Sequence, residues 1–178
     1  MKNINFKETT IAILILLAAF SRILPHPFNF TPITAMALFG SAYFSKKYMA
    51  FLVPLAAMVI SDAWLEFISG FGFHSGTWLI YGTFALITLL GIFTLRKINL
   101  ISVIGSSILG SVIFYLITNF AYFYSEKMYP HSWQGVLASY SAALPFFQNT
   151  LAGDLMYSGI LFGSFYLLQK YVKVLKTA

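Results

Sequence analysis

The chain has 178 residues, of which 59% are hydrophobic and only 9% are charged. About a quarter of the residues in a soluble domain are charged, so this composition excludes an ordinary soluble protein and indicates an integral membrane protein. The formal net charge of +6 comes from cations at the ends of apolar segments, which is typical of membrane topology rather than of nucleic-acid binding. The absence of cysteine excludes disulfides, thiolate metal sites and thiol catalysis.

Six apolar segments predict six transmembrane helices in one domain that covers residues 1–178. They span residues 9–24, 31–44, 48–68, 77–95 and 99–124, and a sixth segment begins at Pro145 after an amphipathic stretch at 136–144. The second segment is only about 14 residues long, which corresponds to roughly 21 Å of helix and is less than the bilayer core of about 30 Å. We therefore expect an all-α membrane protein with a short second helix.

A polar segment rich in proline, residues 22–32, joins the first two apolar segments. Its prolines and polar side chains are Arg22, Pro25, His26, Pro27, Asn29, Thr31 and Pro32. Proline lacks a backbone donor and disfavours helix at the residue before it, so the segment should be extended. Because the helix that follows is short, we expect this segment to lie below the membrane surface. Irregular backbone is tolerated there only beside protein or a water-filled cavity, so the segment is predicted to line a cavity.

Basic residues gather on one side of the six predicted crossings. The side that holds both termini carries Lys2, Lys7, Lys46, Lys47, Arg96, Lys97, Lys170, Lys173 and Lys176, whereas the other side carries only Arg22 and Lys127. Cytoplasmic loops of membrane proteins have an excess of lysine and arginine. The pattern predicts a multi-pass protein with both termini in the cytoplasm, and it places the segment 22–32 on the outer side.

Two aspartates lie inside apolar segments, Asp62 in VISDAW and Asp154 in LAGDLMY. An ionised carboxylate is costly at such a position and usually faces a partner or a cavity. Arg22 is expected at a depth from which its long side chain reaches either aspartate. Three interpretations remain open: an ion pair that holds helices together, direct contact with a ligand, or coupling to protons.

Further amides and aromatic side chains are expected at the same depth, which predicts a polar, aromatic-lined pocket that opens outward. The candidate ligand-contacting residues are Arg22, His26, Asn29, Thr31, Asp62, Trp64, Asn119, Gln148, Asn149 and Asp154. The three histidines come from different loops and lack the spacing of metal ligands, so no metal site is predicted. No known catalytic motif or cofactor fingerprint occurs, so we expect neither catalytic residues nor a cofactor.

Several runs of the sequence are distinctive: RxLPHPxNFTP at 22–32, AMALFG, Ser61-Asp62, Thr118-Asn119-Phe120 and LPFFQNTLAGDLMYSGILFG. In these runs the chain resembles an uncharacterised family of small bacterial membrane proteins. That family is similar in size and six-helix layout to the substrate-binding S components of energy-coupling factor (ECF) vitamin transporters, including the cobalamin-binding members. The first apolar segment, IAILILLAAF, lacks the Ala-x-x-x-Ala face with which S components typically dock.

The resemblance implies an S-component-like bundle in the bacterial cytoplasmic (inner) membrane, a vitamin-like ligand, and an energising module of a T component and ATPases as partner. The sequence thus favours a subunit that binds a small solute for uptake, with the lipid bilayer and a small molecule as partners and no nucleic acid. Two alternatives remain open. One is a structural or assembly protein whose Arg22 and aspartates hold helices together, and the other is a membrane-embedded enzyme that uses Asp62, Asp154 and the histidines.

Overall fold

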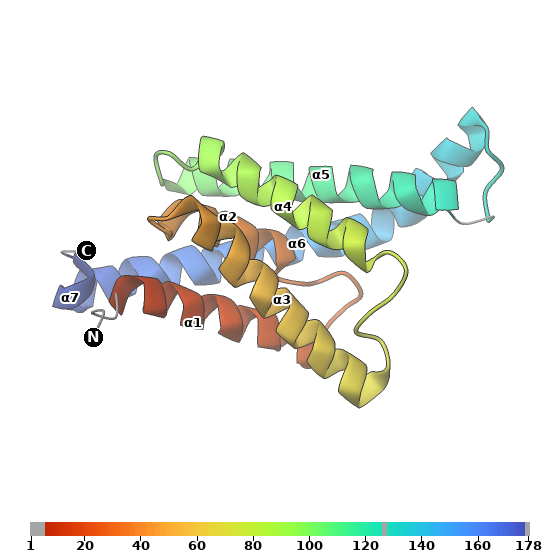
Figure 1. Ribbon diagram of the computed structural model, residues 1–178. Coiled ribbons are helices and arrows are strands. Elements are labelled where there is room, and N and C mark those ends of the chain that lie inside the picture. Colours follow the sequence, from red (N-terminus) through yellow and green to blue (C-terminus); the bar gives the residue numbers. More distant parts are fainter. Residues whose placement is uncertain (1–5, 126–127, 177–178) are drawn as a thin grey trace.

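The computed structural model describes residues 6–125 and 128–176. Helices make up the fold of this part of the chain, and no strand occurs in it. The elements are α1 (Phe6–Phe20), a 3-10 turn η1 (Ser21–Ile23), α2 (Ile33–Tyr43), α3 (Lys47–Ser69), α4 (Thr77–Thr94), α5 (Leu100–Ser125), α6 (Trp133–Tyr171) and the short α7 (Lys173–Lys176) (Figure 1). The predicted all-α class with six main helices is confirmed.

Four of these helices, α3, α4, α5 and α6, contain stretches long and apolar enough to cross a membrane. Helix α2 is apolar but has only 11 residues, so the predicted short second helix is also found. Helix α1 has 15 residues and continues into η1. Several apolar helices of this kind are compatible with a multi-pass membrane protein.

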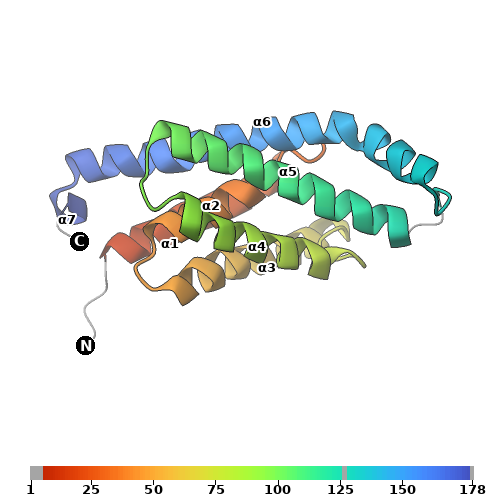
Figure 2. The same cartoon turned by 90° about the horizontal axis from the view of Figure 1, so that it is seen from above.

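The short helix α2 occupies the middle of the bundle. It contacts each of α1, α3, α4, α5 and α6, and both views show it between them (Figures 1 and 2). Every residue from Ile33 to Ser41 is buried. A helix that is apolar on all sides is stable only inside a bundle or in lipid. The first turn of α2 consequently lies inside the protein, where its free backbone N–H groups need partners other than water.

The expected start of a separate helix at Pro145 is wrong. Helix α6 runs without a break from Trp133 to Tyr171 and includes the stretch 136–144 (Figure 2). A proline removes one helix hydrogen bond, and here bonds to α5 hold the preceding stretch in place. The Tyr115 hydroxyl donates to the Tyr140 carbonyl (2.6 Å), and the Tyr140 hydroxyl donates to a carbonyl of α5 (2.7 Å). The 39-residue helix is roughly 58 Å long, so it extends well past a bilayer core of about 30 Å.

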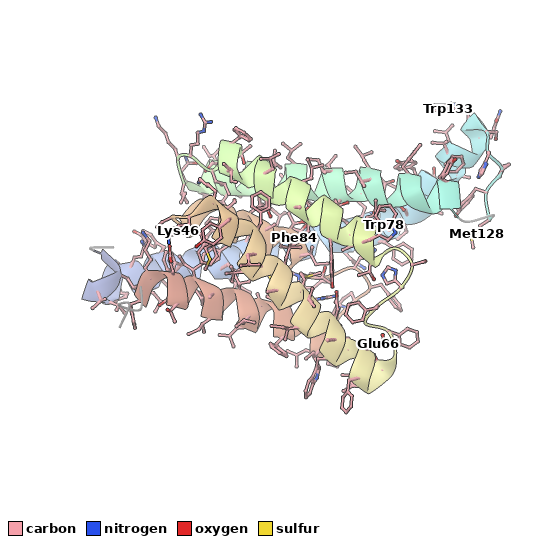
Figure 3. All side chains as sticks on the ribbon, in the orientation of Figure 1. Lys46, Glu66, Trp78, Phe84, Met128 and Trp133 are labelled. Carbon is pink, nitrogen blue, oxygen red and sulfur yellow. The ribbon has the colours of Figure 1, made fainter. Side chains whose placement is uncertain are left out.

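The two ends of the bundle differ in character. Helix α1 begins and α6 ends at the same end as the α2–α3 and α4–α5 turns (Figure 1), and these turns carry the exposed pairs Lys46-Lys47 and Arg96-Lys97. Trp78 and Trp133 lie toward the opposite end (Figure 3). The grouping of basic residues expected from the sequence therefore has a counterpart in space, although Lys2 and Lys127 lie outside the described residues.

The orientation of the bundle is testable because the chain has no cysteine of its own. Lys47, Lys97 and Ser75 are all exposed in the structure, so a single cysteine at each reports only the side of the membrane. We expect Lys47→Cys and Lys97→Cys to escape an impermeant thiol reagent in intact cells, because basic turns stay in the cytoplasm, and Ser75→Cys to react. All three should react in permeabilised cells. The opposite labelling in intact cells would reverse the orientation.

Candidate functional site

The polar segment after η1 forms an irregular loop, residues 24–32. The expectation that the whole of 22–32 is extended is wrong, because residues 22–23 belong to η1 and the chain turns at 28–29. Asn29 adopts a left-handed backbone conformation with φ of 63°, which asparagine tolerates better than most residues. The N–H of Phe30 donates to the carbonyl of Pro27 (3.0 Å) and closes a tight turn around Asn29. The turn brings the chain back to the bundle at the first residue of α2.

The loop 24–32 rests on α6. The side-chain amide of Asn149 donates to the carbonyl of Phe28 (3.0 Å), and the rings of Phe30 and Tyr157 are 6.1 Å apart between centroids. The Tyr157 hydroxyl also accepts a hydrogen bond from Ser21 in η1 (2.9 Å). These contacts attach both halves of the connection between α1 and α2 to the same helix.

A cavity of about 160 Å³ lies between this loop and the buried start of α2. Its lining comes from η1, the loop and four helices: Arg22, Asn29, Thr31, Ile33, Thr34, Ile80, Phe114, Thr150 and Asp154. Asn29 is exposed whereas Asp154 is only 1% exposed, so the cavity leads from the surface into the interior. Most of the lining side chains are polar, in contrast with the apolar bundle around them.

Asp154 lies where α2 begins. The Ser111 hydroxyl donates to its Oδ2 (2.6 Å), and Thr34, in the first turn of α2, faces the carboxylate with both its side chain and its backbone. The residue before the helix is Pro32, and no side chain caps this end in the usual way. Helix N-termini present free N–H groups and favour negative charge. The carboxylate of Asp154 therefore stands in for the missing cap, although it comes from a different helix.

Two hydrogen bonds one helical turn apart join α5 to α6. The first is the bond from Ser111 to Asp154, and the second links the hydroxyls of Ser107 and Ser158 (2.8 Å). Both pairs are buried. The two residues are four apart on each helix, so the two hydrogen bonds follow one another along the contact between α5 and α6.

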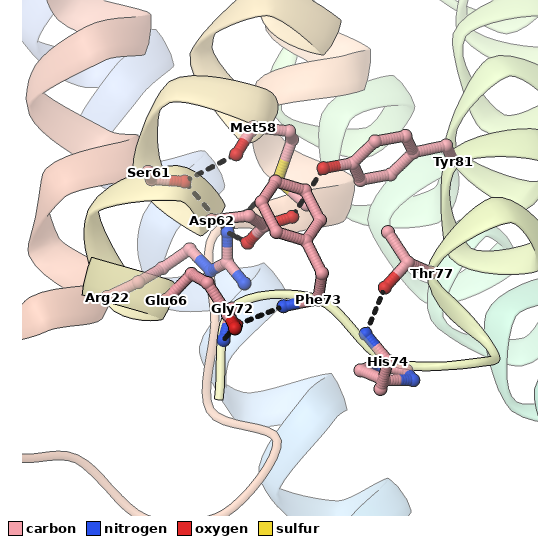
Figure 4. A network of polar contacts seen from close by, with 10 residues as sticks. All are labelled: Arg22, Met58, Ser61, Asp62, Glu66, Gly72, Phe73, His74, Thr77 and Tyr81. Atoms are coloured by element: carbon pink, nitrogen blue, oxygen red, sulfur yellow. Dashed lines mark hydrogen bonds and ion pairs between the residues drawn. The ribbon is translucent and has the colours of Figure 1, made fainter. Parts of the chain in front are cut away.

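Arg22 joins three elements in a second polar network beside the cavity (Figure 4). Its Nη1 lies 2.5 Å from Oδ1 of Asp62 and 2.8 Å from the Ser61 hydroxyl on α3. The Tyr81 hydroxyl on α4 donates to Oδ2 of Asp62 (2.6 Å). Of the interpretations left open for the aspartates, the ion pair thus applies to Asp62. Within the described residues, Asp154 has no basic side chain at salt-bridge distance.

The structure brings only some of the predicted site residues together. Arg22, Asn29, Thr31 and Asp154 line the cavity, and Asp62 lies behind Arg22. The remaining five lie elsewhere. Asn149 holds the loop, Asn119 donates to the Tyr115 carbonyl of its own helix (2.8 Å), and His26 lies against the Leu24 carbonyl (2.6 Å). Trp64 is exposed beside Phe67, and Gln148 is exposed. The sequence did not predict which face of each helix turns toward the cavity.

Sequence reasoning missed five residues of the lining: Ile33, Thr34, Ile80, Phe114 and Thr150. Thr150 had a usable signal, because residues four apart share a helix face and Thr150 precedes Asp154 by that spacing. Ile80 and Phe114 had none, since the sequence does not distinguish an apolar residue that lines a cavity from one that faces lipid.

Comparison with known protein families matches residues 2–175 to a family described as a family of unknown function, DUF6580. The chain belongs to this family. No match was found among curated proteins or among solved structures. Membership of DUF6580 confirms that the chain is part of an uncharacterised family, while the likeness to ECF S components stays a prediction.

In this DUF6580 member the ion pair predicts a selective energetic coupling. Removal of one partner from a buried pair costs roughly 3–5 kcal/mol, because the other charge stays unpaired. Arg22→Ala should therefore lower the free energy of unfolding by about that amount, and Asp62→Asn in the same chain should recover part of the loss. A double-mutant cycle in detergent measures this coupling. Equal coupling of Arg22 to Asp62 and to Asp154 would contradict the observed pairing.

A matched pair of glycines tests how closely the loop packs on α6. A Cβ at Gly153 would lie 3.1 Å from the backbone nitrogen of Thr31, whereas a Cβ at Gly159 would meet nothing within 4 Å. Alanine in a helix interior is favoured over glycine by about 1 kcal/mol. We expect Gly159→Ala to raise the melting temperature. Gly153→Ala should raise it by less, or lower it. Faster cleavage of the loop 24–32 by chymotrypsin in Gly153→Ala alone would locate the effect, and identical behaviour of the two variants would contradict it.

Proposed function

We propose that the chain binds a small, polar, vitamin-like solute in the cavity at the start of α2 and serves as the substrate-binding subunit of an uptake system. The proposal places it in the bacterial cytoplasmic membrane with both termini in the cytoplasm and the loop 24–32 on the outer side. The observation that carries it is a cavity with mostly polar lining residues that runs from exposed Asn29 to buried Asp154. Partly buried polar groups around a cavity inside an apolar bundle are typical of solute sites in membrane proteins.

The size of the cavity favours a small solute. A volume of about 160 Å³ equals roughly five water molecules at about 30 Å³ each, and it is below the range of about 300–1,000 Å³ that is usual for drug-sized ligands. A molecule with a single ring suits this space better than a cobalamin-sized one. A larger ligand would require the loop 24–32 to move away from α6.

The lining offers several kinds of contact. The guanidinium of Arg22 has five N–H donors, and its contacts within the described residues all involve Nη1. The threonine hydroxyls both donate and accept hydrogen bonds, and the ring of Phe114 provides a flat apolar surface. This combination supports a heterocyclic ligand with polar edges. The proposal requires no catalytic residue, and it includes an energising module of a T component and ATPases as the partner that drives uptake.

A structural role is the second candidate, and one observation favours it. The network of Arg22, Asp62 and Tyr81 joins η1, α3 and α4 and needs no ligand to do so. It accounts for Asp62 but not for the cavity, because Asn29 and Asp154 take no part in it.

A thermal-shift screen of water-soluble vitamins and their single-ring precursors tests the proposal. A ligand that binds only the folded protein stabilises it by about 2.7 kcal/mol at a hundred times its dissociation constant. Asn29→Gly removes the side chain but keeps the left-handed turn, and Thr150→Val removes only a hydroxyl. Each should weaken binding of the ligand found by about 0.5–1.5 kcal/mol, the usual value of one hydrogen bond, as measured by calorimetric titration.

Two controls separate this effect from general damage. His26→Ala changes the same loop outside the lining, and Asn119→Ala changes an amide that bonds to its own helix, so both should leave the affinity unchanged. If no compound stabilises the protein, or if both lining variants bind as the unaltered chain does, this cavity is not a ligand site.

A further inference from the structure

The charged side chains at the cavity do not balance. Arg22 and Asp154 line it, and Asp62 pairs with Arg22. One guanidinium and two carboxylates leave one formal negative charge in this part of the described structure. The nearest acidic residue on α3, Glu66, does not change this balance, because it is exposed and binds the backbone N–H groups of the loop after α3.

The excess charge belongs to Asp154. Asp62 has the guanidinium at 2.5 Å, whereas Asp154 receives a hydroxyl bond from Ser111 and faces the start of α2. These dipoles offset part of the cost of burying a carboxylate, but they supply no full positive charge. Asp154 is 1% exposed and yet lines the cavity, so the space beside it is where a neutralising charge fits.

The form of the cavity favours an organic cation over a metal ion. Space for about five water molecules is far more than a single ion needs. Ile33, Ile80 and Phe114 line part of it, which suits a carbon skeleton. Toward Arg22, the N–H groups on Nε and Nη2 have no partner within the described residues, so they are available to an acceptor on the same molecule.

We propose that the ligand of this cavity is a small amine, or a zwitterion, whose positively charged amino group binds the carboxylate of Asp154. This inference rests on the proposed function and adds the charge class of the solute. An acceptor group of the same molecule then lies toward Arg22, and its carbon skeleton lies against Phe114.

The first test uses three probes with one ring and different charges: benzylamine, benzyl alcohol and benzoate. Benzylamine should raise the melting temperature of the full chain in detergent at neutral pH, at a concentration where the other two do not. Asp154→Asn keeps the shape of the side chain but removes its charge, so benzylamine should bind at least tenfold more weakly to this variant. A lack of stabilisation by benzylamine, or equal stabilisation of the unaltered chain and Asp154→Asn, overturns the proposal.

The second test needs no ligand and compares two identical changes. Asp62→Asn leaves the charge of Arg22 unpaired and should lower the melting temperature. Asp154→Asn removes an unpaired charge and keeps an acceptor for Ser111, so its melting temperature should equal or exceed that of the unaltered chain. If Asp154→Asn loses as much stability as Asp62→Asn, the protein itself already neutralises the charge of Asp154, no charge is left for a ligand, and the proposal is wrong.

The remaining outcomes separate this inference from the function on which it rests. Stabilisation by benzyl alcohol or benzoate that persists in Asp154→Asn would show a ligand cavity without the positive charge, so only the inference would fail. Stabilisation by sodium ions alone, measured against a buffer without sodium and lost in Asp154→Asn, would assign the site to an inorganic cation and would also overturn it.

Discussion

The burial of the first turn of α2 is the constraint on which the surrounding part of the bundle depends. The backbone N–H groups of a helix start have no partners within the helix, and Pro32 supplies no side-chain cap. A carboxylate from α6 meets this need, and a hydroxyl of α5 holds that carboxylate in place. The buried start of α2 thus explains why an acidic residue lies deep in the apolar helix α6.

The two aspartates have different surroundings, and this difference organises the site. Asp62 has its cation and a tyrosine hydroxyl, so both of its oxygens have partners. Asp154 faces only the Ser111 hydroxyl and the start of α2, which are dipoles without a full positive charge. The first arrangement fixes the positions of η1, α3 and α4 relative to one another. It thereby also fixes one wall of the cavity, because Arg22 belongs to both the network and the lining.

Much of the fold followed from the sequence, because apolar length and proline content act locally. The helices and the short second helix are found close to where they were predicted, and the segment 24–32 is non-helical, although it turns at 28–29 where an extended chain was predicted. The helix start predicted at Pro145 was wrong, because contacts with α5 outweigh the loss of one helix hydrogen bond. Of the predicted site residues, Arg22, Asn29, Thr31 and Asp154 line one cavity, and their role in binding stays a prediction. The rotation of α5 and α3 about their axes, which turns Asn119 and Trp64 away from the cavity, depends on packing between distant segments and has no local signal.

The two buried hydrogen bonds between α5 and α6 limit how the cavity is able to open. Sliding of one helix along the other by less than a full turn, about 5.4 Å, would break both the Ser107–Ser158 and the Ser111–Asp154 bonds at once. These two bonds fix the register of α5 against α6. The loop 24–32 has only Asn149 and a few ring and backbone contacts on α6. Under the proposed function, solute would therefore enter and leave past this loop, at a rate set by how often those few contacts break.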